Sequence, residues 1–162
     1  MNATPAHSTA GAALLLALAG LALLSTDLAD AADAASPQAV IEARRAGFKK
    51  MGAAMKTLVE QSKTDAPDKA KMAAAGQTIG AYAGDLSGWF PTGSGREAGA
   101  DTDALPYIWE ARTKFDSIAG QLGPETQNLA TALAGDDLAA IRGQVKTLGG
   151  VCSNCHRSYR AD

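Results

Sequence analysis

The sequence predicts an all-α protein that folds as an antiparallel four-helix bundle. Of its 162 residues, 46% are hydrophobic but only 5% are aromatic. Ala and Leu, which are strong helix formers, carry much of the hydrophobic fraction, whereas Val and Ile are sparse. Four segments repeat apolar residues at steps of three and four, and all but one of the links between them are short. A chain of this length is expected to form one domain.

The first helix is predicted from residue 37 to about residue 62. Ser36 suits the N-cap and Pro37 suits the first helical position, where a missing N–H leaves nothing unpaired. One stripe recurs at helical spacing: Val40, Arg44, Gly47, Phe48, Met51, Met55 and Leu58. The lysines at 49, 50 and 56 fall on other faces, so the stripe is expected to face the core.

The second helix is expected to begin near Asp65, with Pro67 in its first turn and Asp68 near the positive end of the helix dipole. Its stripe is Met72, Ala75, Ile79, Tyr82 and Leu86. The sequence Trp89-Phe90-Pro91 is expected to end this helix. Residues 92–103 then form a Gly-rich polar loop.

A third helix is predicted to start around Leu105-Pro106. Its stripe is Ile108, Ala111, Phe115, Ile118 and Leu122, with Trp109 beside it. Gly123-Pro124 should break or kink this helix, because proline lacks the N–H and clashes with the preceding turn. Residues 125–133 resume helical character, so either one kinked helix or two short collinear helices are expected.

The fourth helix is capped by Gly135-Asp136-Asp137 and has the most regular stripe. That stripe consists of Leu138, Ile141, Val145, Leu148, Cys152, Cys155 and Tyr159. Both cysteines are therefore predicted to face the core. Gly149-Gly150 either simply weakens the helix or lets a neighbouring group approach closely.

This last helix carries both cysteines of the chain, in the order Cys-x-x-Cys-His. On a helix, Cys152, Cys155 and His156 crowd one side of a single turn. The pattern is the attachment signature of a c-type haem. Two thioethers can hold the vinyl edge of the porphyrin while the imidazole reaches the iron as an axial ligand. We therefore predict one covalent haem c.

Other interpretations of the two cysteines are a redox dithiol, half of a zinc site and an ordinary disulfide. A tetrahedral zinc site needs four ligands, and His7 is the only other histidine, in a segment expected to be removed. A thioredoxin-like motif should lie near a βαβ pattern, and the sequence has no visible strand pattern.

Residues 11–24 are almost wholly apolar but too few to span a bilayer. Small residues follow, and two A-x-A sites end at Ala31 and Ala34. Residues 1–31 are predicted to be a secretory signal peptide, with cleavage at 34 as an alternative, and residues 32–162 to be the bundle. No Lys or Arg precedes the apolar run, although a signal peptide usually has one there, so the alternative is that this segment is retained as a membrane anchor. Export would place the protein in the periplasm, which suits thioether attachment outside the cytoplasm.

A Cys-x-x-Cys-His motif at the C-terminal end of a four-helix chain resembles cytochrome c′ and its class II c-type relatives. The resemblance covers about residues 40–160. Residues 40–48, VIEARRAGF, are similar to the family's N-terminal Arg segment with its distal-pocket residue four places later. Ile108-Trp109 is like the family's Ile-Trp pair, and Tyr159-Arg160 is like the usual ending of the motif.

The resemblance implies a role for each matching residue. His156 would be the sole protein ligand to iron. Arg44 would lie near a haem propionate, which a guanidinium can bind in a fixed fork, and Arg45 is the alternative for this role. Arg160 would border the proximal face, or else remain a solvated charge that complements the helix dipole.

Phe48 matches the position that decides the functional subclass. In the family it is either apolar, which leaves the iron five-coordinate, or a methionine, which makes it six-coordinate and low-spin. Phenylalanine cannot ligate iron, so the resemblance implies a high-spin protein with a closed pocket that binds nitric oxide or carbon monoxide and can transfer electrons. The alternative is a low-spin electron carrier with Met51 or Met55 as sixth ligand, although methionines at helical spacing usually fill cores.

The remaining expectations concern activity and partners. A peroxidase would be helped by a distal acid or base, which the chain without its leader has no second histidine to supply, so an enzyme is not expected. The net charge of −2 does not favour nucleic acid or a membrane surface as a partner. The resemblance implies a homodimer through the first two helices, which the sequence leaves open, and the redox partner protein is not specified.

Overall fold

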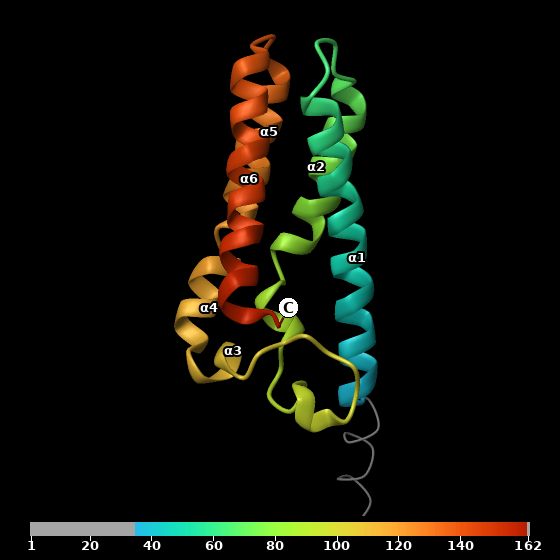
Figure 1. The fold of residues 1–162 in the computed structure, drawn as a ribbon, viewed down its shortest axis with the longest axis vertical. Coiled ribbons are helices and arrows are strands. Elements are labelled where there is room, and N and C mark those ends of the chain that lie inside the picture. Colours follow the sequence, from blue (N-terminus) through green and yellow to red (C-terminus); the bar gives the residue numbers. More distant parts are fainter. Residues whose placement is uncertain (1–34, 162) are drawn as a thin grey trace, which may run out of the picture. The chain divides into compact units, whose positions relative to one another are not determined.

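The computed structural model describes residues 35–161, so the predicted signal peptide at residues 1–31 lies outside the described part. Four helices form the bundle (Figure 1): α1 (Pro37–Ser62), α2 (Lys69–Ala83), α5 (Leu122–Ala134) and α6 (Leu138–Tyr159). The connection between α2 and α5 contains the shorter elements η2 (Ser87–Trp89), η3 (Arg96–Ala98), α3 (Tyr107–Glu110) and α4 (Arg112–Ala119).

The four long helices pack in a closed order. Helix α1 lies against α2, α2 against α5, α5 against α6, and α6 against α1. The chain runs up and down in turn through these helices (Figure 1), so the predicted antiparallel four-helix bundle is confirmed. Helices α3 and α4 pack on the C-terminal part of α6, where the Cys-x-x-Cys-His motif lies. Within residues 35–161, no helix is both long and apolar enough to cross a bilayer.

Helix α1 begins as its sequence predicts. Pro37 opens the helix, and the Ser36 hydroxyl accepts a hydrogen bond from the Ala39 N–H at 3.2 Å. The buried stripe differs from the prediction at its first position, because Ile41 is 1% exposed whereas Val40 is only half-buried. The core-facing side of α1 is therefore turned by one residue at its N-terminal end.

Helix α2 is shorter at both ends than predicted. Asp68 is its N-cap and accepts a hydrogen bond from the Lys71 N–H at 3.0 Å, so Pro67 precedes the helix instead of lying in its first turn. The carboxylate satisfies one of the first N–H groups of the helix, which have no partner within it. The helix ends at Ala83, and Leu86 is buried in the turn that leads to η2.

The predicted third helix is divided into three. The first interruption is at Ala111, whose φ of −118° and ψ of 44° are not helical. The second comes after Ala119, at the C-cap Gly120. Pro124 lies in the first turn of α5, where a backbone N–H has no intrahelical partner in any case. The second interruption therefore lies at the carbonyl four residues before Pro124, where a proline disturbs a helix, so the break expected from Gly123-Pro124 is found at Gly120. The interruption at Ala111 was not expected.

Helix α6 is capped and continuous. The Asp137 carboxylate accepts hydrogen bonds from the N–H groups of Ala139 and Ala140 at 2.8 and 3.1 Å. The helix continues through both glycines to Tyr159. A Cβ atom on Gly149 would lie 3.4 Å from the Met55 Cε, whereas one on Gly150 would have nothing within 4 Å. Of the two glycines, Gly149 is therefore the one that a neighbouring side chain approaches.

A closer approach occurs on α1. A Cβ atom on Gly47 would lie 2.5 and 2.8 Å from two carbons of the Trp89 indole ring. The Gly47→Ala variant is therefore expected to lose about 1–3 kcal/mol of unfolding free energy, because the packed ring must shift. Denaturant unfolding of both proteins measures this loss.

Gly143→Ala on α6 is the control, because a Cβ atom at this helical position would have nothing within 4 Å and the residue lines neither cavity. It is expected to leave the stability unchanged or raise it by up to about 1 kcal/mol, since alanine is the better helix former. Equal effects of the two substitutions would show that the Gly47–Trp89 contact does not limit the side chain at residue 47.

Candidate haem-binding site

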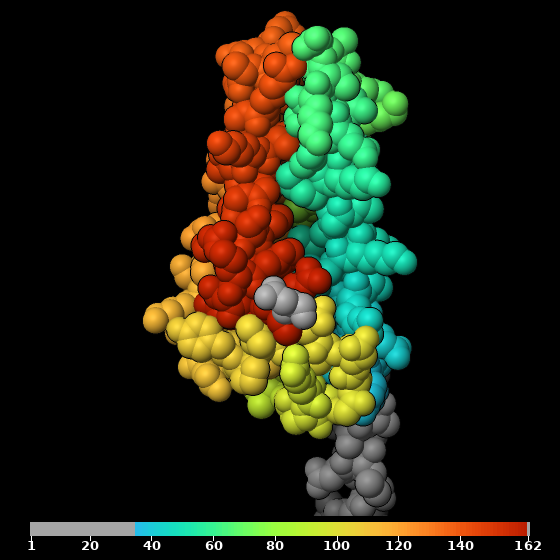
Figure 2. Space-filling model, viewed as in Figure 1, coloured from blue at the N-terminus to red at the C-terminus, as the bar shows by residue number. Residues whose placement is uncertain are grey.

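A cavity of about 880 Å³ lies between α1 and α6, where Figure 2 shows the surface hollowed between these helices. This volume is in the upper part of the range of about 300–1,000 Å³ that is usual for ligand pockets. Apolar side chains from α1, α3, α4 and the α2–α3 connection supply much of its wall: Met51, Val59, Leu86, Ile108, Phe115 and Ile118.

The Cys-x-x-Cys-His motif lies on the α6 wall of this cavity. Cys152, Cys155 and His156 all line it, and both cysteines are half-buried. Helical spacing places the three side chains together, as the sequence predicted. Cys155 also packs against the aromatic cluster that includes Phe115 and Tyr159.

The electrostatics of the two thiols do not suit a reactive dithiol. Burial raises the pKa of Cys152, and burial together with the neighbouring Cys152 raises the pKa of Cys155 to about 11. Redox-active cysteines have lowered pKa values, because the thiolate is the reactive form. Residues 35–161 also contain no cluster of three His, Cys, Asp or Glu side chains that could hold a metal ion. The geometry thus favours neither the redox nor the zinc interpretation.

The surroundings of His156 favour the neutral form of the ring, which a metal requires. Burial lowers its pKa, and the positive charge of Arg160 lowers it further. A neutral imidazole has a free lone pair with which to coordinate iron. A large apolar slot with two thiols and a neutral imidazole on one wall fits a covalently attached porphyrin whose iron faces the cavity.

Phe48 lies on the opposite wall, contributed by α1. Its ring lines the cavity and contacts Trp89 edge-on at 5.2 Å and Phe90 at 6.1 Å between ring centres. Met51, which is buried, and Met55, which is half-buried, line the same cavity. The structure therefore places the aromatic residue and the two methionines together on the α1 wall of the cavity, across from the α6 motif.

Arg44 is only 4% exposed, and its guanidinium binds the α2–α3 connection. One terminal nitrogen donates to the Trp89 carbonyl at 3.3 Å and to the Ser94 hydroxyl at 3.1 Å. The other donates to the Ser94 carbonyl at 3.0 Å and to the Thr102 hydroxyl at 2.8 Å. The guanidinium also lies 4.4 Å from the centre of the Phe90 ring. Each terminal nitrogen of the Arg44 guanidinium thus already has two hydrogen-bond acceptors within the protein.

Arg45 is differently placed, although it lines the same cavity. It forms an ion pair with Asp101 at 2.9 Å, in which the two side chains are 57% and 81% exposed. Such a pair is weak and can exchange partners. The geometry therefore favours Arg45, the alternative from the sequence, over Arg44 as the partner of a propionate.

Arg160 lies at the end of α6 and also lines the cavity. Its N–H donates to the His156 carbonyl at 3.1 Å, and its side chain pairs with Asp103 at 3.5 Å. Because it follows His156 by one helical turn, it lies on the side of the cavity predicted to be proximal.

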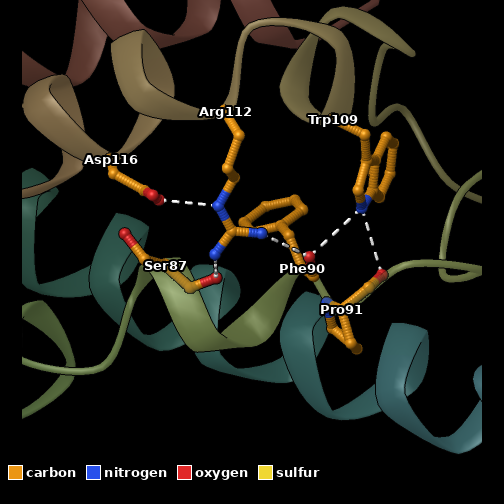
Figure 3. Close-up of polar contacts among 6 residues, drawn as sticks. All are labelled: Ser87, Phe90, Pro91, Trp109, Arg112 and Asp116. Atoms are coloured by element: carbon orange, nitrogen blue, oxygen red, sulfur yellow. Dashed lines mark hydrogen bonds and ion pairs between the residues drawn. The ribbon is translucent and has the colours of Figure 1, made fainter.

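Sequence reasoning did not identify the segment of residues 87–94 as part of the site. Figure 3 shows how α3 and α4 hold it. Arg112 donates to the carbonyls of Ser87 and Phe90 at 2.8 and 2.9 Å, and its ion pair with Asp116 at 2.8 Å fixes its orientation. The Trp109 ring N–H is shared between the carbonyls of Phe90 and Pro91, each at 3.1 Å. The sequence did contain a signal for this segment, because Trp89 and Phe90 are adjacent in a chain that is only 5% aromatic.

Comparison with known proteins agrees with this site. The cytochrome c′ family model matches residues 39–160. Cytochrome c′ from Rhodopseudomonas palustris is 34% identical over 149 residues, which cover 89% of this chain and 93% of that protein. Cytochrome c-556 from Agrobacterium tumefaciens (strain B2A) is 36% identical over 121 residues, covering 74% of this chain and 95% of that protein.

A solved structure shows the same fold. The crystal structure of cytochrome c′ from Thermochromatium tepidum superposes with a TM-score of 0.72 at 25% identity, covering 79% of this chain and 98% of that one. The likeness therefore extends over almost the whole of each relative and includes the α6 motif. The chain belongs to the cytochrome c′ family, whose members carry covalently attached haem c.

Proposed function

We propose that this protein is a periplasmic, high-spin haem protein that binds nitric oxide or carbon monoxide at its distal side and can transfer electrons. The observation that carries the proposal is the position of Phe48. Its ring, which has no atom that can ligate iron, lies on the cavity wall across from the α6 motif. The iron would then have one protein ligand and a sixth position open to a small uncharged molecule.

Each residue of the site has a part in this proposal. Cys152 and Cys155 hold the haem through thioethers, and His156 is the axial ligand. The bound haem supplies the iron that takes up a diatomic gas. Phe48 excludes water and anions from the distal side, because an aromatic ring offers them no hydrogen bond. Arg45 and Arg160 carry positive charge at the rim of the cavity, where it can offset the propionates.

An absorption spectrum of the purified protein, recorded with and without carbon monoxide, tests the coordination. We expect a broad Soret band typical of high-spin iron, which shifts and sharpens when carbon monoxide binds the ferrous protein. Sharp low-spin bands in the resting protein, with no response to carbon monoxide, would contradict the proposal.

The second candidate is a low-spin electron carrier in which Met51 or Met55 ligates the iron. It is favoured by the presence of both methionines on the cavity wall. A Cβ atom on Gly149 would lie 3.4 Å from the Met55 Cε, so the methyl end of this thioether approaches α6 just before the motif. A sulfur–iron charge-transfer band in the oxidised protein would identify this state.

Export and oligomeric state are further proposals. Mass spectrometry of the mature protein should show one added haem and a first residue of Ala32 or Ala35, according to which A-x-A site is cut. A mass that retains residues 1–31 would contradict signal cleavage. Sedimentation of the haem-loaded protein distinguishes a homodimer from a monomer.

A further inference from the structure

The Phe48 ring has a second side, which faces away from the cavity. The indole of Trp89 meets it there, edge-on, at 5.2 Å and an angle of 77° between the ring planes. Phe48 lines the cavity, whereas Trp89 is not among the residues that line it. Trp89 therefore lies behind Phe48, and the Phe48 ring can swing outward only if Trp89 yields or turns.

Trp89 has little freedom to move. Gly47 approaches its ring so closely that even a methyl group would overlap it, and Tyr82 contacts it edge-on at 5.4 Å.

The backbone around Trp89 is also held. The Trp89 carbonyl accepts a hydrogen bond from the buried Arg44. The neighbouring Phe90 carbonyl accepts from both Arg112 and Trp109 (Figure 3). The indole is thus confined by packing, its own carbonyl is held by a donor from α1, and the next carbonyl in the chain is held by donors from α3 and α4.

Some space remains on the outer side of Trp89. A second cavity of about 530 Å³ lies there, and Trp89, Gly47 and Tyr82 are among its lining residues. The indole therefore lies between Phe48, which lines the haem cavity, and a partly open space at the surface of α1 and α2. A shift of the ring into that space would release Phe48.

We propose that Trp89 is a positioning residue that holds the Phe48 ring over the distal side of the haem and thereby limits the rate at which a diatomic gas reaches the iron. This inference rests on the proposed function, because it assumes that Phe48 lies between the gas and the iron. Trp89 itself touches neither the gas nor the haem. It acts by setting how readily Phe48 moves.

The test begins with the haem-loaded Trp89→Leu protein, in which the edge-on contact is lost but the site stays apolar. The rate of carbon monoxide association with the ferrous protein is expected to rise about two- to tenfold, the factor to which one aromatic pair contact corresponds. The resting spectrum should be unchanged. Leu129→Ala is the control, because Leu129 is fully buried but does not line the haem cavity. It should destabilise the protein without changing the rate.

A double-mutant cycle shows whether Trp89 acts through Phe48. In the Phe48→Ala background the distal ring is absent, so adding Trp89→Leu should no longer change the association rate. If Trp89→Leu has the same effect in both backgrounds, Trp89 does not act by positioning Phe48 and the inference is overturned. If Phe48→Ala speeds association but Trp89→Leu does not, the proposed function stands and only the inference fails. If carbon monoxide binds neither the parent protein nor Phe48→Ala, the proposed function itself is wrong.

Crystal structures supply a measurement that does not depend on ligand binding. In the resting Trp89→Leu protein the Phe48 side chain is expected to adopt a second rotamer or to move outward. An unchanged, single Phe48 conformer would overturn the inference. Trp89→Phe serves as a second variant if the leucine variant does not fold, with the same direction expected for both the rate and the ring position.

Discussion

Arg44→Met is expected to lower the free energy of unfolding by about 2–4 kcal/mol, because it leaves several buried hydrogen-bond acceptors without a donor. The guanidinium of Arg44 serves the carbonyls of Trp89 and Ser94 and the hydroxyls of Ser94 and Thr102. Ser94 is 1% exposed, so water cannot replace these bonds without opening the loop. Methionine preserves much of the volume of the arginine stem but donates no hydrogen bond. Thermal or denaturant unfolding measures the difference.

Arg45→Met provides the control on the adjacent residue. Its ion pair with Asp101 is exposed, so the expected loss is about 0–1 kcal/mol. The two variants change the formal charge equally and differ only in what the side chains contact. Comparable losses would show that Arg44 does not stabilise the α2–α3 connection. If Arg45 holds a propionate as proposed, Arg45→Met should instead shift the reduction potential of the haem.

Phe48→Met is expected to convert the iron from five-coordinate high-spin to six-coordinate low-spin. The substitution places a thioether on the cavity wall across from the His156 motif, where Phe48 now lies. Methionine sulfur is a normal axial ligand of c-type haem. The absorption spectrum should therefore gain sharp low-spin bands and a sulfur–iron charge-transfer band, and carbon monoxide binding should slow strongly because it must displace the new ligand.

Phe48→Leu is the matched control for this change. Leucine is apolar and has no ligating atom, so the iron should remain five-coordinate and high-spin. If the spectrum of Phe48→Met is identical to that of the parent protein, the residue at position 48 does not reach the iron. Together the two variants separate the effect of a new ligand from the effect of reshaping the pocket.

Features that depend on neighbours in the chain could be predicted from the sequence. Ser36 and Asp137 cap their helices as expected, because an N-cap side chain bonds to an N–H two or three residues away. Cys152 and Cys155 face the interior as the stripe of the last helix predicted, since helical spacing alone fixes their side of α6. The start of α2 was misjudged, because Asp68 and not an earlier residue bonds to the first turn.

Features that depend on residues far apart in the chain could not be predicted. Arg44 and Ser94 are 50 residues apart, yet their hydrogen bonds decide which partners remain available to the guanidinium. The interruption at Ala111 was not predicted, whereas the one at Gly120 lies four residues before Pro124, where a proline disturbs a helix. Neither the aromatic contact between Phe48 and Trp89 nor the approach of Gly47 to that ring is encoded in any local pattern.

The sequence by itself determined the class of the fold and the helix on which Cys152, Cys155 and His156 lie together, because both follow from helical periodicity. Tertiary structure alone decided that Arg44 is buried and Arg45 exposed, and that Trp89 packs against Phe48. Those outcomes depend on how the connection between α2 and α3 folds back against α1. Its path is fixed by buried hydrogen bonds and ring contacts between segments 40 or more residues apart.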